Sequence, residues 1–183
     1  MRRTPGCLQP PTVLITVGLL LLVASPHVYA DGVQKAGDVL SIALPGTATG
    51  LALGFKDREG ALQFGKAAAL TVGVTYGLKY AVNEERPDGR DLSFPSAHTS
   101  ISFASAEFLR KRYGWKYGLP AYSAATFVAY SRVESEQHYT HDVIAGAAIG
   151  VLSSYLFTRP LKNWRVRVEA DRKYYGIWLS RIW

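Results

Sequence analysis

The chain has 183 residues, a length that predicts a single domain. Its formal net charge is +7, which suits anionic partners such as phosphate groups or acidic lipid headgroups. The sequence has no basic tract with interleaved aromatic residues and no DNA-binding motif, so it does not indicate a nucleic acid partner. A single cysteine, Cys7, excludes a disulfide within the chain and a metal site built from several cysteines.

Residues 1–30 have the pattern of a secretory signal peptide. Two arginines at the start are followed by the apolar stretch Val13–Ala24, and Val28-Tyr29-Ala30 provides a cleavage sequence before Asp31. The alternative is an uncleaved N-terminal anchor, because no charged residue interrupts Thr4–Ala30. Both interpretations predict an extracytoplasmic protein, in the bacterial periplasm and associated with the inner membrane.

The remaining residues, 31–183, predict one all-α domain, a bundle of about five or six helices. A helical segment starts near Ala97 and ends in a charged cluster before Gly114. Four further runs are apolar and rich in small residues, and none reaches the ~18 uncharged residues of a comfortable membrane span. They are either core helices of a soluble bundle or short membrane helices packed through small residues. The runs are Val39–Phe55, Ala67–Leu78, Tyr117–Ser131 and Val143–Thr158.

The C-terminal tail, residues 160–183, differs from the helical part. Arg165–Glu169 alternates polar and apolar residues, which is the period of a β-strand, and the aromatic-rich segment Tyr174–Trp183 follows after Asp171–Lys173. This pattern predicts a small β-hairpin. The hairpin either packs on the end of the bundle or places its Trp and Tyr residues at a membrane surface.

The stretch from Lys79 to His98 predicts a binding site for a tetrahedral anion. Lys79 ends an apolar run, and Arg86 follows seven residues later, directly before a proline. Pro95-Ser96-Ala97-His98 then leads into a helix, whose first N–H groups and positive dipole end attract anions. Arginine and lysine are the side chains that best complement phosphate oxygens.

A third segment, Ser131–Asp142, adds a candidate nucleophile. If it is helical, His138 and Asp142 share a face, so the carboxylate can accept the Nδ1–H of the imidazole and leave Nε2 unprotonated. Arg132 is a third cation in the same segment. Each of these pieces alone is common at helix ends, and only their conjunction is specific.

The order Lys-x6-Arg-Pro, Pro-Ser-x-His, Ser-Arg-x5-His-x3-Asp resembles the type 2 phosphatidic acid phosphatase (PAP2) superfamily, over about Lys79–Gly150. The resemblance implies a helical phosphatase that needs no metal and forms a phosphohistidine. It implies that His138 is the nucleophile, that Asp142 orients it and that His98 is the general acid and base. Lys79, Arg86, Arg132, Ser96 and the N–H of Ala97 would then hold the phosphoryl oxygens.

One position departs from the resemblance, because the superfamily usually has glycine where this chain has Ala97. A Cβ there would cost roughly 1 kcal/mol if the backbone had a positive φ, and nothing if the backbone were helical. We expect activity to survive this difference.

The expected function is hydrolysis of a phosphate monoester or a lipid diphosphate, without a metal or another cofactor. Candidate substrates are phosphatidic acid, phosphatidylglycerol phosphate, undecaprenyl diphosphate, lipid A phosphate groups and small soluble esters, and a membrane surface is the expected partner. Two alternatives are a vanadate-dependent haloperoxidase, since vanadate mimics phosphate in such a site, and a non-catalytic protein that binds lipid phosphate, which Ala97 alone supports.

Overall fold

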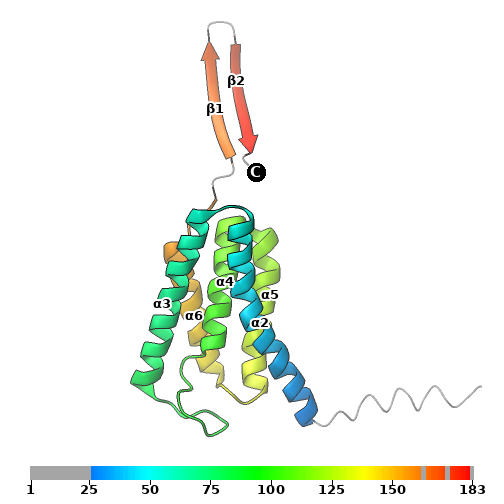
Figure 1. The fold of residues 1–183 in the computed structure, drawn as a ribbon, viewed down its shortest axis with the longest axis vertical. Helices are drawn as coiled ribbons and strands as arrows, with labels where there is room; N and C mark the ends of the chain where they lie inside the picture. Colours follow the sequence, from blue (N-terminus) through cyan, green and yellow to red (C-terminus); the bar gives the residue numbers. More distant parts are fainter. Residues whose placement is uncertain (1–25, 162–163, 172–173, 182–183) are drawn as a thin grey trace, which may run out of the picture.

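A computed structural model describes residues 26–161, 164–171 and 174–181, with side chains described for residues 31–161. Within these ranges the chain forms five helices and one pair of strands (Figure 1). This architecture confirms the expected all-α bundle. The helices are α2 (Pro26–Gly54), α3 (Arg58–Val82), α4 (Ala97–Tyr113), α5 (Trp115–Glu134) and α6 (Thr140–Phe157), and the strands are β1 (Trp164–Asp171) and β2 (Tyr174–Arg181).

Helix α4 is the central helix of the bundle, since it contacts α2, α3, α5 and α6. Two glycines one turn apart let α6 lie directly against it. A Cβ at Gly150 would lie 2.1 Å from the carbonyl oxygen of Ser100, and a Cβ at Gly146 would lie 2.6 Å from that of Ser96. Small residues at this spacing permit close helix–helix packing. The beginning of α4 is therefore held beside the beginning of α6.

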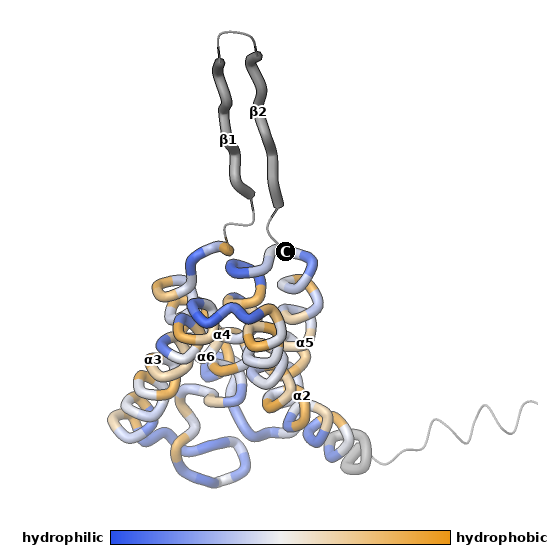
Figure 2. The backbone as a smooth tube through the Cα atoms, turned by 45° about the horizontal axis from the view of Figure 1, so that its top comes forward, coloured by the Kyte–Doolittle hydropathy of each residue, from blue (hydrophilic) through white to orange (hydrophobic). Residues whose placement is uncertain are grey.

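The bundle buries many polar residues beside an apolar core that includes Phe64 and Phe108, and it leaves many large apolar residues exposed. Helix α4 buries one threonine and several serines, as well as Glu107 and Arg112. On the outer helices Ile42 and Leu156 are 75% and 71% exposed, and Figure 2 shows apolar residues along the outer helices. Single exposed apolar residues are common in soluble proteins, but many large ones on the outer helices, together with charged groups buried inside, are not. Other large apolar residues that are exposed include Val39, Leu53, Leu62, Val72, Leu119, Ile144 and Leu152.

Two helical segments, Asp31–Gly54 and Thr140–Phe157, are long and apolar enough to cross a membrane, judged by length and composition. The first is longer than its uncharged run because α2 includes Lys35 and Asp38. From the sequence we expected no run to be long enough for a comfortable membrane span, because only the uninterrupted uncharged residues were counted.

The loop between α3 and α4 lies at one end of the bundle. Helix α3 stops at Asn83, a left-handed residue (φ 47°, ψ 47°) whose N–H donates to the carbonyl of Lys79. The loop closes on itself, because the N–H of Ser93 donates to the carbonyl of Glu84 at 2.7 Å. Its polar character is visible in Figure 2. The closure fixes the segment that leads into Pro95 and α4.

The opposite end of the bundle is held by a buried ion pair. Arg112 at the end of α4 donates to both carboxylate oxygens of Asp57, which lies between α2 and α3, and also to the carbonyl of Arg159. These contacts connect the ends of α2, α3, α4 and α6, so the ion pair holds the helices together at this end of the bundle.

The strands β1 and β2 pair antiparallel, with Arg165 opposite Ser180, and extend from the end of the bundle opposite the α3–α4 loop (Figure 1). The expected hairpin is confirmed. Its side chains and the turn residues 172–173 lie outside the described set, so a membrane-surface role for its aromatic residues stays a prediction. The same holds for signal cleavage: residues 1–25 are outside the described range, and α2 runs through the expected cleavage point at Ala30.

Candidate active site

The three sequence segments meet at the end of the bundle that carries the α3–α4 loop. The N–H of Ser96 donates to the carbonyl of Asp142 at 3.1 Å, and the Ser93 hydroxyl donates to Asp142 Oδ2 at 2.5 Å. Lys79 is buried, and its Nζ donates to the carbonyls of Leu92 and Ser93 at 2.5 and 3.1 Å. The end of α3, the loop and the first turns of α4 and α6 therefore form one site.

His138 is buried beside the carboxylate that the sequence assigned to it. Its Nδ1 lies 3.3 Å from Asp142 Oδ2. The two residues do not share a helix, however, because α6 begins at Thr140 and His138 lies in the preceding turn. They meet because Asp142, in the first turn of α6, also accepts the N–H of Tyr139 at 2.9 Å and so points back toward the turn. The spacing therefore predicted the contact between His138 and Asp142 correctly, but the expectation that both lie on one helix was wrong.

The environment of His138 keeps its imidazole neutral. Burial, followed by the positive charges of Lys79 and Arg86, lowers the pKa of His138 to about 4, and these effects outweigh the opposing influence of Asp142. A carboxylate on the Nδ1 side favours the tautomer with the proton on Nδ1. Nε2 then has a free lone pair, which a nucleophile requires.

Arg132 is buried, and all of its N–H groups have partners. Nη1 donates to Asp38 Oδ1 at 2.8 Å and to Gln137 Oε1 at 3.0 Å. Nη2 donates to the carbonyl of Gln34 at 2.9 Å and to the Ser131 hydroxyl, which also accepts from Nε. The guanidinium is thus fixed between α5 and α2 before any ligand binds.

The close approach of α2 to Arg132 depends on Gly37. A Cβ at this position would lie 1.9 Å from the Ser131 hydroxyl and 2.7 Å from Arg132 Nη2. The absence of a side chain at position 37 brings the backbone carbonyl of Gln34 and the side chain of Asp38 within reach of the guanidinium.

Arg86 lies near the site and has a buried donor that no described residue satisfies. Its Nε is buried and has no hydrogen-bond partner among the described residues. The charge of Asp142 and that of Arg132 both act on Arg86, so the guanidinium lies near both. A buried N–H without a partner is costly, and it marks a place where an acceptor such as a phosphate oxygen can bind.

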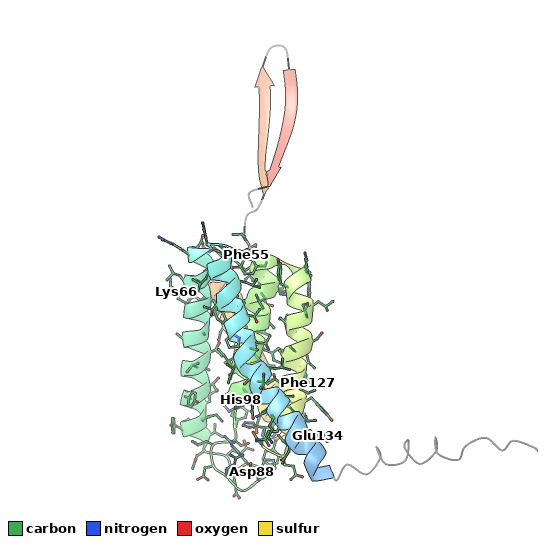
Figure 3. All side chains as sticks on the ribbon, turned by 45° about the vertical axis from the view of Figure 1, so that its right-hand side comes forward. Phe55, Lys66, Asp88, His98, Phe127 and Glu134 are labelled. Atoms are coloured by element: carbon green, nitrogen blue, oxygen red, sulfur yellow. The ribbon has the colours of Figure 1, made fainter. Side chains whose placement is uncertain are left out.

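His98 lies in the first turn of α4 and is 45% exposed, so it is open to a ligand (Figure 3). Its Nε2 lies 3.7 Å from Asp38 Oδ1. Partial burial and the charge of Arg132 lower the pKa of His98, with smaller contributions of the same sign from Arg86 and Lys79. The same two cations, Lys79 and Arg86, therefore act on both histidines.

Ser96 and Ala97 form the start of α4. Ser96 is buried, and its hydroxyl accepts a hydrogen bond from Thr99 at 3.1 Å rather than capping the helix. Ala97 is the first helical residue and is absent from the non-glycine residues with positive φ, which are Lys56, Asn83, Leu92 and Glu136. Alanine at the position where glycine is usual therefore causes no backbone strain.

The sequence matches the profile of the PAP2 superfamily over residues 60–165, more than half of the chain and the whole of the site except its contacts with α2. The chain belongs to the PAP2 superfamily.

Two relatives extend this assignment. This PAP2 phosphatase is 31% identical over 169 residues to a lipid A 4'-phosphatase of Helicobacter pylori, covering 82% of this chain and 85% of that protein. It is 38% identical over 88 residues to a lipid A 1-phosphatase of Porphyromonas gingivalis, covering 46% of this chain but only 20% of that protein.

Two solved structures share the fold. The crystal structure of Aquifex aeolicus LpxE superimposes with a TM-score of 0.54 at 23% identity, covering 65% of this chain and 83% of that chain. A transmembrane PAP2-type phosphatidylglycerolphosphate phosphatase of Bacillus subtilis superimposes with a TM-score of 0.57 at 20% identity, covering 80% of this chain and 85% of that chain. At these identities the likeness shows the PAP2 fold.

Sequence reasoning missed two residues of this PAP2 site and underrated a third. Asp38 lies on α2, far from the motifs, and nothing in its neighbourhood indicates a site. Ser93 precedes the Pro-Ser-x-His motif and looks like an ordinary loop serine. His141 is adjacent to Asp142 in the sequence rather than one helical turn away, so the spacing gives it no role; its Nε2 lies 3.0 Å from Glu84 Oε1 and 3.3 Å from Asp142 Oδ1.

The ligand atoms of Glu84, His141 and Asp142 lie within 4.8 Å of one another, a spacing that could hold a metal ion. The positive charges of Lys79 and Arg86 also act on Asp142 and oppose a divalent cation there. Catalysis without a metal stays our prediction.

Proposed function

We propose that this protein hydrolyses a phosphate ester of a membrane lipid, with lipid A as the leading substrate, through a phosphohistidine at His138. The observation that carries the proposal is the buried contact of His138 with Asp142, close to Arg86, whose Nε has no hydrogen-bond partner among the described residues. A nucleophile and an unsatisfied cationic donor in one site suit attack on a bound phosphoryl group.

In the proposed first step, Nε2 of His138 attacks phosphorus and the bond from phosphorus to the lipid oxygen breaks. His98 gives its proton to that oxygen. In the second step His98 takes a proton from water, whose oxygen attacks phosphorus, and the bond between phosphorus and Nε2 breaks. Lys79, Arg86, Arg132, Ser96 and the N–H of Ala97 are proposed to stabilise the equatorial oxygens, where negative charge is greatest.

An apolar groove between α2 and α5 supports a lipid substrate. The groove has a volume of about 270 Å³ and begins on α2 at Leu40, two residues beyond Asp38. Along α2 it extends to Leu51, away from the site, over roughly 16 Å at 1.5 Å per residue. A phosphate at the site could therefore place an attached acyl chain in the groove. The remaining lining residues are Ala43, Leu44, Thr47, Leu109, Tyr117, Pro120, Ala121 and Ala124.

The surface of the bundle supports a location in the membrane. Its many exposed apolar side chains and the polar groups buried in its interior match a lipid environment, and α2 and α6 are the candidate spans. We propose that the bundle is held in the inner membrane, with the active site on the periplasmic side. The expectation of a non-catalytic lipid-phosphate binder rested on Ala97, whose ordinary backbone removes that support.

The test is a phosphate-release panel with the purified full chain in detergent. Substrates are lipid A, phosphatidic acid, phosphatidylglycerol phosphate, undecaprenyl diphosphate and p-nitrophenyl phosphate, each with and without a chelator. We expect release from lipid A in the presence of chelator, and its loss in His138→Ala. Glu134→Ala, an exposed change on the preceding helix (Figure 3), is the matched control. Full activity of His138→Ala would refute the mechanism.

Acid-stable and acid-labile phosphate on the protein can then be separated after rapid mixing with radiolabelled substrate. A phosphohistidine is acid-labile. His98→Gln slows both proposed steps with a lipid substrate, so the labelled substrate is p-nitrophenyl phosphate, whose leaving group needs no proton. With this substrate only the second step depends on His98, and we expect the phosphohistidine to accumulate in the variant. Equal labelling of His138→Ala would place the phosphoryl group on another residue.

A further inference from the structure

The partners of Arg132 raise a question about how a phosphate binds there. All five N–H bonds of its guanidinium point at acceptors within the protein: the Ser131 hydroxyl, the carbonyl of Gln34, the Gln137 side chain and Asp38. A phosphoryl oxygen can bind this side chain only by replacing one of them.

Asp38 differs from the other three partners in charge and in exposure. Its side chain is 42% exposed, whereas Arg132 is 1% exposed and Ser131 and Gln137 are buried. The Gln34 contact is made by a backbone carbonyl of α2, which cannot turn away without moving the helix. Asp38 is thus the one partner whose side chain can rotate into water, where its charge is solvated.

Resting on the proposed function, we propose that the Asp38 carboxylate occupies the place of a phosphoryl oxygen at Arg132 in the free enzyme, and that the substrate phosphate displaces it. A carboxylate oxygen and a phosphate oxygen make the same kind of charge-assisted hydrogen bond to a guanidinium. Without Asp38, the buried Arg132 charge would have no anionic partner among the described residues until substrate arrived.

The contact of Asp38 with His98 gives the displaced carboxylate a second position. Asp38 Oδ1 already lies 3.7 Å from Nε2 of His98. A carboxylate beside His98 favours the protonated imidazole that a general acid needs, against the opposing charges of Arg132, Arg86 and Lys79. Asp38 is therefore a positioning residue that exchanges partners as phosphate enters and leaves.

The backbone beneath Asp38 is fixed, so this exchange involves the side chain alone. The close contact of Gly37 with Ser131 leaves α2 no room to shift toward α5. Within α2, the Ser41 hydroxyl donates to the backbone carbonyl of Asp38 at 2.7 Å, which adds to the helical hydrogen bonds at this position.

The experiment measures binding of inorganic phosphate and of orthovanadate by calorimetry to the full chain in detergent. Asp38→Asn removes the competing charge with almost no change in size. We expect the Kd for phosphate to fall by about five- to tenfold, because the anion no longer displaces a charged partner. Asp31→Asn is the matched control, since it makes the same change on an exposed residue of the same helix, two turns away.

A second readout is the pH profile of kcat/KM with the lipid substrate found in the panel. Loss of the carboxylate beside His98 lowers the pKa of that residue further, so the alkaline limb of Asp38→Asn moves to lower pH. Asp31→Asn leaves the limb in place.

Three results for Asp38→Asn would overturn the proposal: an unchanged Kd for phosphate, a higher Kd, or loss of cooperative thermal unfolding. The last result would make Asp38 a structural partner of Arg132. Phosphate binding is measured without turnover, so its outcome is separate from that of the proposed function. Absence of phosphate release from every substrate by the wild type would refute the function, whereas normal release with an unchanged Kd in Asp38→Asn would refute only the role of Asp38.

Discussion

The Ser93 hydroxyl donates to Asp142 Oδ2 at 2.5 Å, although the two residues are 49 positions apart in the sequence. The same oxygen accepts the N–H of Tyr139 and lies 3.3 Å from Nδ1 of His138. A loop residue and a helix end thus fix the carboxylate from two directions. Asp142 can therefore hold one orientation of the imidazole, and Ser93 belongs to the candidate site.

Replacing Ser93 by alanine removes one of these two donors. We expect kcat to fall by about 10- to 100-fold, as for other residues that orient a catalytic ligand through a hydrogen bond. KM should change little, because Ser93 contacts Asp142 rather than the predicted phosphate position. Steady-state kinetics of Ser93→Ala beside Ser123→Ala, an exposed serine on α5, give the comparison. Equal kcat values in the two variants would remove Ser93 from the site.

The two histidines predict an acidic optimum for kcat/KM. His138 must be neutral to attack, so activity falls only as the pH approaches its pKa of about 4. His98 must be protonated to act as an acid, and its pKa is below the usual 6.5, so activity falls again as the pH rises through that range. A pH–rate profile between pH 3 and 9 checks both limbs. A maximum above pH 8 would contradict this assignment.

His138 also makes folding stability depend on pH. The unfolded chain binds a proton at this residue below about 6.5, whereas the folded chain resists protonation until about 4. The free energy of unfolding therefore decreases as the pH falls from 6.5 to 4, by up to about 3 kcal/mol from this group. We expect His138→Gln to flatten that slope in thermal unfolding measurements, and the same slope in the variant would exclude His138 as its source.

Packing of α6 on α4 predicts a contrast between two glycines. Gly150→Ala puts a Cβ 2.1 Å from the carbonyl of Ser100, and we expect about 1–3 kcal/mol of destabilisation and a loss of activity as the first turns separate. Gly77→Ala on α3 meets nothing within 4 Å and should stabilise the helix by up to about 1 kcal/mol. Chemical denaturation of both variants is the measurement, and equal stabilities would contradict the packing argument.

The groove between α2 and α5 predicts a change that affects lipid substrates alone. Ala124→Phe fills part of the groove, so KM for lipid A should rise by about tenfold while KM for p-nitrophenyl phosphate stays the same. Thr126→Phe, an exposed change two residues away on the same helix, controls for added bulk. Equal effects on the KM of both substrates, or no effect on the KM for lipid A, would show that the acyl chain of the lipid binds outside this groove.

The catalytic motifs could be predicted because each is local: spacing alone brought His138 to Asp142, and a proline and serine placed His98 at a helix start. The position of His138 in a turn was missed because a spacing of four residues has two explanations. The two residues can share a helix face, or the second can lie in the first turn of a helix and contact a residue of the preceding turn, as Asp142 does here. Asp38 had no such signal, since its role arises only when α2 packs against α5 through Gly37. The exposure of so many large apolar side chains could not be seen in four short apolar runs, because it depends on which helix faces pack against α4.

The hairpin and the active site lie at opposite ends of the bundle (Figure 1). For a bundle that crosses a bilayer, this separation assigns them to different compartments: a catalytic end in the periplasm leaves β1 and β2 facing the cytosol. An impermeant antibody raised against the hairpin would then bind spheroplasts only after their membrane is opened, while substrate added outside would be hydrolysed throughout.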